Sequence, residues 1–357
     1  MKFLRSNQKT ALLWLVFFTA GFLSAVFLTS DRDINVNKTD KEAASEQGVP
    51  EVEPLRILFG GDIFLDRSVR RQIEAHDDDA GYPWQNIESF LKQFEYKVAN
   101  LEGPVVNRPR AAPTGSFSFA FQEDYVAKLK DLGFSALSLA NNHTLNQGQK
   151  GLDNSRIYLE KNGIAYFGDP NNLGERSFWT TEWEGKKLAF VGKHDLIPDP
   201  QSQVLAKIVE LKSQGYFVVV FPHWGAEYIS EIPVDEQNKA RELIDMGADL
   251  IIGAHPHVVQ PIEIYKDRVI FYSLGNFLFD QGFSSETMQG LLVEAVFEED
   301  NIKFILYPTE QNKTFQVNLA STEARQAMLD RISAGSVVSD NIKESIKSGE
   351  FAIEYAN

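Results

Sequence analysis

The chain has 357 residues, of which 43% are hydrophobic, and its formal net charge is −15. This length and apolar content allow one large domain or two ordinary ones with a sizeable core. The acidic balance, without a basic stripe carrying interleaved aromatic residues, argues against nucleic acid as a partner, because phosphate contacts need clustered Lys and Arg. The sequence has no cysteine, which excludes disulfides, thiolate metal ligands and a cysteine nucleophile.

Residues 10–30, TALLWLVFFTAGFLSAVFLTS, contain no charged side chain. A run of about 20 apolar residues can cross a bilayer as a helix. It is longer than the apolar core of a signal peptide and lacks a clean cleavage site, so we expect an uncleaved transmembrane anchor; a signal peptide and a buried helix are the alternatives. Lys2, Arg5 and Lys9 precede the run and acidic residues follow it. This asymmetry predicts a cytoplasmic stub at 1–9 and a single-pass protein of the cell membrane whose C-terminal part is extracytoplasmic.

Residues 31–54 are polar and acidic and end in prolines, which predicts a solvated linker. Beyond it, apolar runs typical of strands alternate with segments of helical spacing. The strand-like runs are 55–64, 96–103, 135–143, 187–195, 216–225 and 248–257, and the helical segments are 68–76, 85–94, 123–133, 150–163, 203–215 and 235–247. This alternation predicts an α/β layered fold.

The predicted alternation of strands and helices ends at residue 268. RVIFYSLGNFLFD (268–280) and LLVEAVFEEDNIKFILYPTE (291–310) follow one another without a helix between them, which predicts antiparallel strands that complete a sheet in the same domain. Residues 311–357 are mostly amphipathic and helical and carry none of the candidate chemistry, so we expect a C-terminal helical extension.

Polar side chains of unusual kind follow the strand-like runs. In α/β folds, ligands bind beyond the carboxyl ends of strands. Carboxylate, amide and imidazole groups together suit a divalent cation such as Mn, Fe or Zn. Five of the six histidines stand at such positions; the full set is Asp62, Asn100, Glu102, Asn141, Asn142, His143, His194, His223, His255 and His257.

Several of these residues also have a structural interpretation. Asp62 could cap a helix, the two asparagines before His143 could form a turn, and His194 is typical of a hydrogen-bonded loop histidine. The pair His255 and His257 is the strongest signal, because two imidazoles at one strand end favour a cation.

Six motifs occur in a fixed order. They are GGDIFLDR (60–67), NLEGP (100–104), LANNHTLNQG (139–148), FPHWGAEY (221–228), GAHPHVVQPIE (253–263) and YSLGNFLFDQ (272–281). Together they resemble the CapA family, the capsule or poly-γ-glutamate synthesis proteins of bacteria, which is itself similar to the calcineurin-like metallophosphoesterases. The resemblance covers residues 55–310. It implies a four-layer αββα sandwich of the metallo-dependent phosphatase type, with two metal ions at one end of the sheets.

The same resemblance implies roles for individual residues. Asp62 and His257 would hold the first metal, Glu102 would bridge, and the second metal would be held by Asn142, His223 and His255. His143 would be the catalytic histidine that binds no metal and protonates a leaving group or steadies a phosphoryl oxygen. The expected substrate contacts are Asn100, Asn141, Trp224 and Asn276.

The chain departs from the family patterns at three positions. Phe64 stands where the phosphoesterase motif D-x-H has its histidine, the bridging residue is Glu102 instead of an aspartate, and Asn146 replaces an aspartate common in the CapA family. We therefore expect a weak first metal site, to which Asp66 could contribute.

Three functions remain open. The first is a membrane-anchored, extracytoplasmic metal-dependent hydrolase that acts on a capsule or poly-γ-glutamate-like envelope polymer. The second is an accessory factor for synthesis or export of a polyanionic polymer, with polymer synthase or export proteins as partners. The third is a non-catalytic scaffold with a degenerate metal site. His143 argues against the third, because a structural metal needs no general acid. Glycosidase chemistry by Asp62 and Glu102 would leave the histidines unexplained.

Basic side chains that could hold a polyanion are few near the first motifs. They are Arg67, Arg70, Arg71, Arg108 and Arg110, and an ordinary surface role is the simpler interpretation of all five.

Overall fold

The computed structural model describes residues 53–107, 112–113, 115–198 and 202–355. The predicted stub, the anchor at 10–30 and nearly all of the linker lie outside these residues, as do Arg108 and Arg110. Within the described part of the chain, no helix is long and apolar enough to cross a membrane.

The described residues form a first sheet of nine strands. Its order is β16-β15-β14-β1-β2-β5-β6, with β13 paired to β1 and β17 paired to β15. The strands β1, β2, β5 and β6 are parallel, and β14 to β17 are antiparallel. The bounds are β1 (Leu55–Ile63), β2 (Tyr96–Leu101), β5 (Ala136–Ser138), β6 (Ala165–Phe167), β13 (Asn276–Leu278), β14 (Gln289–Phe297), β15 (Asn301–Gln311), β16 (Val317–Leu319) and β17 (Glu350–Glu354).

A second sheet of six strands has the order β11-β12-β10-β9-β8-β7 in the same described residues. Its strands are β7 (Phe178–Trp183), β8 (Lys186–His194), β9 (Phe217–His223), β10 (Leu250–Ile252), β11 (Ile262–Tyr265) and β12 (Arg268–Phe271). A small ladder joins β3 (Val105–Val106) to β4 (Phe121–Gln122).

The helices alternate with the strands as the sequence predicts. They are α1 (Arg67–Ala75), α2 (Glu88–Leu91), α3 (Glu123–Asp131), α4 (Gly148–Lys161), α5 (Gln203–Ser213), α6 (Val234–Asp245), α7 (Thr322–Gly335) and α8 (Asp340–Ser348), with short 3-10 turns η1 (Tyr82–Trp84) and η2 (Gly174–Arg176). The predicted α/β class is therefore confirmed.

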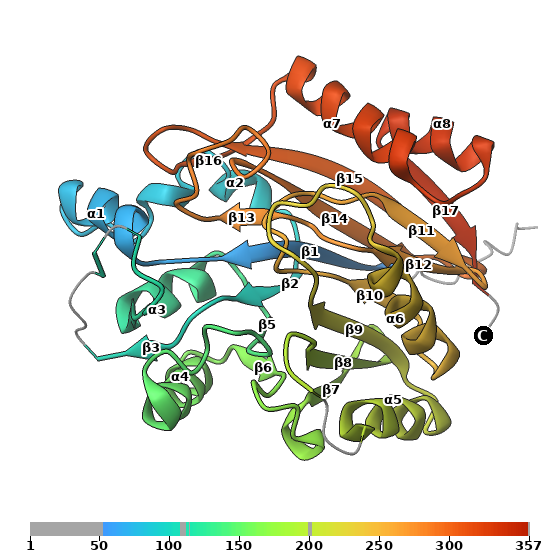
Figure 1. The fold of residues 1–357 in the computed structure, drawn as a ribbon, viewed down its shortest axis with the longest axis horizontal. Coiled ribbons are helices and arrows are strands. Elements are labelled where there is room, and N and C mark those ends of the chain that lie inside the picture. The colour runs from blue at the N-terminus through green and yellow to red at the C-terminus, as the bar shows by residue number, and fades with distance from the viewer. Residues whose placement is uncertain (1–52, 108–111, 114, 199–201, 356–357) are drawn as a thin grey trace, which may run out of the picture. The chain divides into compact units, whose positions relative to one another are not determined.

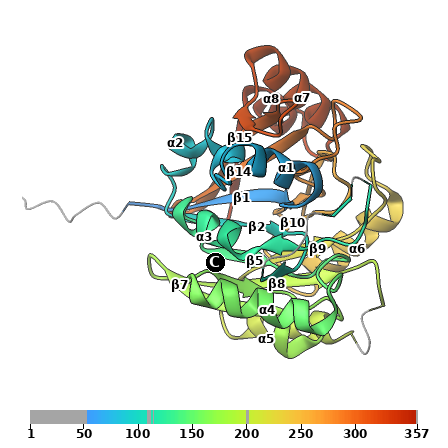
Figure 2. The same cartoon turned by 90° about the vertical axis from the view of Figure 1, so that its left-hand side faces the viewer.

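Three hydrophobic clusters define the layers. One cluster fills the space between the two sheets, where Phe59 of β1 meets Phe221 of β9 with ring centroids 5.9 Å apart. A second packs α1 to α4 on the outer face of the first sheet, and a third packs α5 and α6 on the outer face of the second. The order is helices, sheet, sheet, helices. The helices α7 and α8 belong to neither outer layer and lie far from α4 and α5 in Figure 2.

Residues 311–357 contain the expected helices but also strands that the sequence analysis does not predict. The strand β17 pairs with β15 from Asn301↔Glu354 to Ile305↔Glu350, and β16 pairs with the other end of β15. The helices α7 and α8 lie against these strands (Figure 1) and add Met328, Leu329 and Ile346 to the cluster between the sheets. This segment thus completes the first sheet.

Two glycines allow the sheets to meet at one end. A Cβ atom at Gly61 would lie 1.9 Å from the carbonyl oxygen of Gly275, and one at Gly253 would lie 1.9 Å from that of Tyr272. The chain passes between them from β12 of the second sheet to β13 of the first, where Asn276 pairs in register with Asp62. The crossing therefore fixes the end of β1 beside the end of β10.

Candidate metal centre

The polar residues predicted from the strand ends come together where the two sheets meet. Asp62 is the last residue but one of β1 and Glu102 follows β2, while Asn142 and His143 follow β5, all in the first sheet. His223 is the last residue of β9 in the second sheet, and His255 and His257 follow β10. Asp62, Glu102, His143, His223, His255 and His257 are all buried, and Asn142 is half-buried.

Their ligand atoms form two overlapping groups. One comprises Glu102, His255 and His257, and the other comprises Asp62, Glu102 and His223; within each group the atoms lie within 4.8 Å of one another. Glu102 belongs to both groups. Asn142 joins the second through its amide oxygen, which is 2.9 Å from Nε2 of His223.

Several atoms in this cluster lack any hydrogen-bond partner. Both carboxylate oxygens of the fully buried Glu102 are unpaired, and so are Nδ1 of His223 and Nδ1 of His255. Buried polar atoms are nearly always paired, and an unpaired buried carboxylate is costly. Divalent cations held by the two groups would satisfy these atoms, so the residues present fit a metal.

Burial shifts the pKa values of several groups in the cluster. Burial, then the adjacent charge of Asp62, raises the pKa of Glu102 well above its usual range. Burial, and then the neighbouring imidazoles, lower the pKa of His255 to about 4 and that of His223 well below its usual value. His223 and His255 are therefore neutral at physiological pH, which is the form of imidazole that binds metal ions.

The asparagines expected to contact substrate orient the cluster instead. Asn141 donates to Oδ1 of Asn100 at 3.1 Å, and Asn100 donates to Oδ1 of Asp62 at 2.7 Å. The amide oxygen of Asn141 accepts hydrogen bonds from the backbone of His143 and of Thr144. Asn100 and Asn141 are buried, so this network fixes the carboxylate and the loop that carries His143.

Asn276 plays a similar part for His257. Its amide nitrogen donates to Gln281 and to the carbonyl of Thr287, which leaves its oxygen to accept from Nδ1 of His257 at 2.9 Å. This bond sets the tautomer, so Nε2 is the free nitrogen of His257, 3.7 Å from Oε1 of Glu102. Asn276 is fully buried and is thus a positioning residue.

His143 is placed by Asn146 and Phe119. The amide oxygen of Asn146 accepts from the backbone N–H of Phe119 at 2.8 Å and lies 3.0 Å from Nδ1 of His143. The His143 and Phe119 rings pack with centroids 4.0 Å apart. Nδ1 therefore donates, and Nε2 of His143 faces the cluster 3.9 Å from Oε1 of Glu102. Burial lowers the pKa of His143.

Trp224 does not line the site. It belongs to the hydrophobic cluster beneath α5 and α6, is 1% exposed, and donates from its indole nitrogen to the carbonyl of Tyr272. We therefore correct its expected role from substrate contact to core packing.

His194 and Asp66 also lie outside the two ligand groups. Nδ1 of His194 is 2.8 Å from the carbonyl oxygen of Pro170, and its ring centroid lies 6.2 Å from that of His223. Asp66 caps α1 and accepts from the backbone of Ala112 and Ala120, so it holds a loop.

Phe64 places an apolar ring where the phosphoesterase motif has a histidine ligand. Its ring stacks on Phe279 with centroids 4.3 Å apart and meets Phe119 edge-on. The buried Arg67 lies over the Phe64 ring at 4.7 Å and pairs with Asp280. Arg67 is therefore part of the structure behind the site, and its charge also acts on Glu102.

Sequence reasoning missed Glu227, Tyr228 and Gln281 as individual residues, although all three fall inside quoted motifs. The charge of Glu227 acts on Glu102, His143 and His255. The ring of Tyr228 stacks on that of His257 with centroids 6.1 Å apart. Their positions depend on loop geometry, which strand and helix periodicity does not report.

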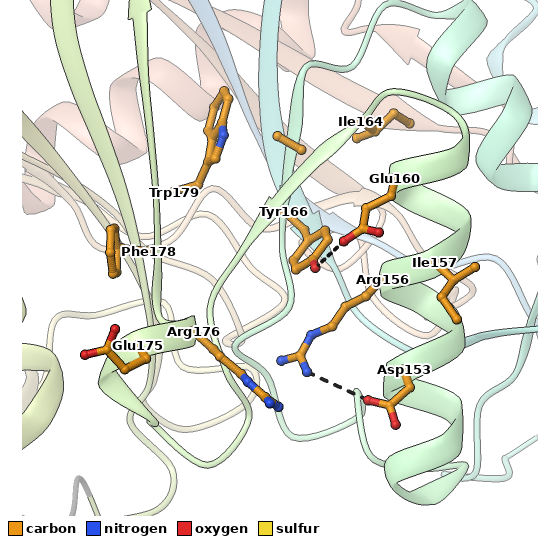
Figure 3. Close-up of a pocket in the computed structure, with 11 residues that line it drawn as sticks. Asp153, Arg156, Ile157, Glu160, Ile164, Tyr166, Glu175, Arg176, Phe178 and Trp179 are labelled. Carbon is orange, nitrogen blue, oxygen red and sulfur yellow. Dashed lines mark hydrogen bonds and ion pairs between the residues drawn. The ribbon is translucent and has the colours of Figure 1, made fainter.

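A cavity of about 700 Å³ lies elsewhere, between α4, β6 and β7 (Figure 3). Arg156, Tyr166, Arg176 and Trp179 are among the residues that line it, and none of the ligand cluster does. Arg156 is paired with Asp169 at 3.0 Å, so its charge is already compensated. The cavity is separate from the candidate metal centre.

Two facing sheets with imidazoles and a shared carboxylate at one end define an α/β sandwich protein with a buried cluster that could bind metal. The model of the bacterial capsule synthesis protein PGA_cap family matches residues 56–281. The chain therefore belongs to this family, which confirms the resemblance carried by the six motifs.

The names of two similar proteins are consistent with this family. The chain is 32% identical over 258 residues to the PGA biosynthesis protein CapA of Bacillus subtilis, covering 67% of each chain. It is 30% identical over 266 residues to the capsule biosynthesis protein CapA of Bacillus anthracis, covering 68% of this chain and 64% of that one. Among solved structures it is similar to a novel phosphatase from Mycoplasma pneumoniae, with 14% identity, a TM-score of 0.42, and coverage of 75% of this chain and 92% of that one.

The burial of four histidines predicts acid sensitivity of the metal-free protein. In the unfolded chain a histidine takes up a proton near pH 6.5. Burial lowers the pKa of His143, His194, His223 and His255, so below that pH the unfolded state binds more protons and the free energy of unfolding falls. His255 alone contributes about 3 kcal/mol of this loss once the pH is below 4. Glu102 and Glu236 act in the opposite direction, because burial raises the pKa of both and favours a protonated folded state, but they are two groups against four.

Denaturant unfolding of chelator-treated protein between pH 7.5 and 5 measures this slope, the change in the free energy of unfolding with pH. His255→Asn should reduce it, and His76→Gln, at an exposed residue, should leave it unchanged. An unfolding free energy that is constant from pH 7.5 to 5 would contradict the buried, neutral histidines.

Proposed function

We propose that the chain is a metal-dependent hydrolase that acts on a capsule or envelope polymer. The observation that carries the proposal is the unpaired carboxylate of Glu102, shared between two groups of imidazole and carboxylate ligands. Following the family resemblance, Asp62 and His257 would hold a first divalent ion, Asn142, His223 and His255 would hold a second, and Glu102 would serve both. The ligand atoms themselves divide differently, with Glu102 grouped once with His255 and His257 and once with Asp62 and His223. Mn, Fe and Zn are the ions that this set of oxygen and nitrogen donors suits.

Bound divalent ions would supply an activated water and would polarise the bond to be broken. The chain's own residues carry the other tasks. Asn100 and Asn141 orient Asp62, and Asn276 holds His257 in the required tautomer. His143 is held by Asn146 with Nε2 facing the cluster, and in its doubly protonated form it is placed to donate from Nε2 to a substrate oxygen or to a leaving group.

The polymer class is inferred from relatives. Two are named for capsule or PGA biosynthesis, and a third, from Mycobacterium tuberculosis, is named a probable polyglutamine synthesis accessory protein and is 26% identical over 291 residues. We infer a role for this chain in synthesis, export or processing of such a polymer, with polymer synthase or export proteins as partners.

One observation favours a second candidate function. Phe64 packs into an aromatic cluster and offers no ligand, so the proposed first ion has few protein ligands. A protein that binds polymer through a partly filled site, as a non-catalytic scaffold, fits this feature. The catalytic proposal is preferred because a scaffold gives no reason to hold His143 toward Glu102.

We also propose that residues 10–30 anchor the chain in the cell membrane, with the folded domain on the extracytoplasmic side. The support is the charge-free apolar run and the basic residues before it. The whole chain should stay in the membrane fraction after an alkaline carbonate wash, and protease added to intact spheroplasts should degrade its folded domain. Release by carbonate, or complete protection from protease, would contradict the anchor or its orientation.

Substitutions at His143 and Asn146 test the catalytic proposal. His143→Gln should lower turnover of bis(p-nitrophenyl) phosphate with Mn²⁺ by about 10²-fold to 10⁴-fold without loss of bound metal. Asn146→Asp places a carboxylate beside Nδ1 of His143, favours the imidazolium and raises its pKa. The alkaline limb of the pH–rate profile should therefore move to higher pH. Full activity of His143→Gln, or an unchanged profile in Asn146→Asp, would remove the general-acid role.

A further inference from the structure

A second cavity, of about 430 Å³, lies beside the loops that carry the candidate metal ligands. Val259 in its wall is two residues beyond His257, so the Cα atoms of these two residues are at most about 7 Å apart. Ser230, also in the wall, is two residues beyond Tyr228, whose ring stacks on that of His257. One polymer chain could therefore reach both the metal centre and this cavity, here called the α7 cavity.

Contacts between elements fix the walls of the α7 cavity. Nε2 of Gln260 donates to the carbonyls of Ile229 and Glu231, which joins the loop after β9 to the loop after β10. The end of α7 packs closely on the second of these loops, since a Cβ atom at Gly335 would lie 2.5 Å from Cγ of Pro261. The shape of the cavity is thus set by packed backbone and does not depend on loose surface side chains.

Arg331 of α7 lines the cavity and is half-buried. One of its guanidinium nitrogens donates to the neutral side chain of Gln289 at 3.2 Å, and its buried Nε has no hydrogen-bond partner. Within the described residues no ion pair joins this guanidinium to a carboxylate. A charge withdrawn from water without a counter-charge is costly. A carboxylate ligand would compensate it, because the planar fork of donors matches two carboxylate oxygens.

The other charges near the cavity leave this position open. Glu231 lines the same cavity but is exposed, so solvent and salt screen its charge. Glu263, which accepts from the lining residue Gln237, is already paired with Arg241 at 2.7 Å. The divalent ions proposed at the metal centre add positive charge close by. An anionic chain is therefore attracted both by Arg331 and by the metal centre.

The rest of the wall is largely apolar, which restricts the kind of carboxylate that fits. A γ-glutamyl unit carries its carboxylate beside two methylene groups, whereas a uronic acid carries it on a ring covered with hydroxyls. Apolar walls suit methylene groups, because hydroxyls buried there without partners are unfavourable. An apolar lining with a few polar groups is typical of a ligand site. The apolar residues of the wall are Ile232, Val259, Pro261, Ile332 and Val337.

We propose that the α7 cavity binds one γ-glutamyl unit of the polymer, with the carboxylate at Arg331 and the methylene groups on the apolar wall. A neighbouring part of the same chain would then lie at the metal centre. The helix α7 lies beyond residues 56–281, which the family model matches, so a segment outside that model helps to form the subsite. The inference rests on the proposed function and specifies which unit of the polymer is recognised.

Calorimetry of the full chain in detergent tests the subsite, with γ-linked tetraglutamate as the probe and Mn²⁺ present. We expect Arg331→Gln to weaken binding about tenfold or more, and conversion of the α-carboxylates of the probe to amides to weaken binding to the wild type. The effect of amidation should shrink in Arg331→Gln, because both changes remove the same contact. The loss caused by Arg331→Gln should persist after chelation, which separates the subsite from carboxylates bound to metal.

Two further variants accompany Arg331→Gln. Val337→Glu places a negative charge at an exposed residue of the cavity wall and should also weaken binding about tenfold, even if Arg331→Gln folds poorly. Arg325→Gln removes the same charge from a part of α7 outside the cavity and should bind normally.

Equal binding by the wild type and Arg331→Gln, no effect of amidation, or tighter binding of tetragalacturonate than of tetraglutamate would each overturn the proposal. Bound metal and turnover of bis(p-nitrophenyl) phosphate are measured on the same wild-type samples. Metal and turnover without binding that depends on Arg331 reject the subsite and leave the hydrolase intact. Binding that depends on Arg331, in a protein without metal or turnover, supports the subsite and rejects the hydrolase.

Discussion

The buried carboxylate of Glu102 is the constraint on which the rest of the site depends. It is fully enclosed, and neither of its oxygens has a hydrogen-bond partner in the protein. Such a group is costly when ionised, and burial accordingly raises its pKa. The imidazoles and Asp62 around it form two ligand groups that share Glu102, so divalent cations in these groups would satisfy the unpaired atoms. A fold optimised for stability alone would have no reason to bury this group unpaired.

Other energetically unfavourable features lie close to Glu102. His255 and His257 both have positive φ angles, +98° and +59°, so each imidazole is presented from a strained backbone. The close contact of Gly61 with the carbonyl of Gly275 leaves no room for a side chain in β1 just before Asp62. These features concentrate where the chain crosses from one sheet to the other. Strain and unpaired groups in one place, within a well-packed α/β core, are typical of a site selected for chemistry.

Much of this arrangement could be predicted from sequence, because two signals are local. Apolar runs of strand length followed by polar residues identified β1, β2, β5, β9 and β10, and the carboxyl ends of parallel strands meet in space. The strands β6, β7, β16 and β17 were missed. The strands β6 and β16 have only three residues each, too few for an alternating pattern to be recognised, and the edge strand β7 is mostly half-buried and pairs with its neighbour β8. The strand β17 follows two helices and returns to β15, a pairing that local periodicity does not report. The predicted role of Trp224 is wrong because a motif shows only which residues are adjacent in the chain. It does not show that the indole turns into the core on the other face of the sheet. Tyr228 lies four residues beyond Trp224, and its left-handed backbone and its hydrogen bond to the carbonyl of Pro256 place its ring against that of His257.

Metal content of the purified protein tests the central claim most directly. Mass spectrometry on protein prepared without chelating resin should find close to two equivalents of Mn, Fe or Zn per chain. His255→Ala should lose metal, and His76→Ala, at an exposed histidine outside the cluster, should retain it. A stoichiometry near zero, even after Mn²⁺, Fe²⁺ and Zn²⁺ are added back, would contradict the account and leave Glu102 as a buried carboxylic acid without a cation.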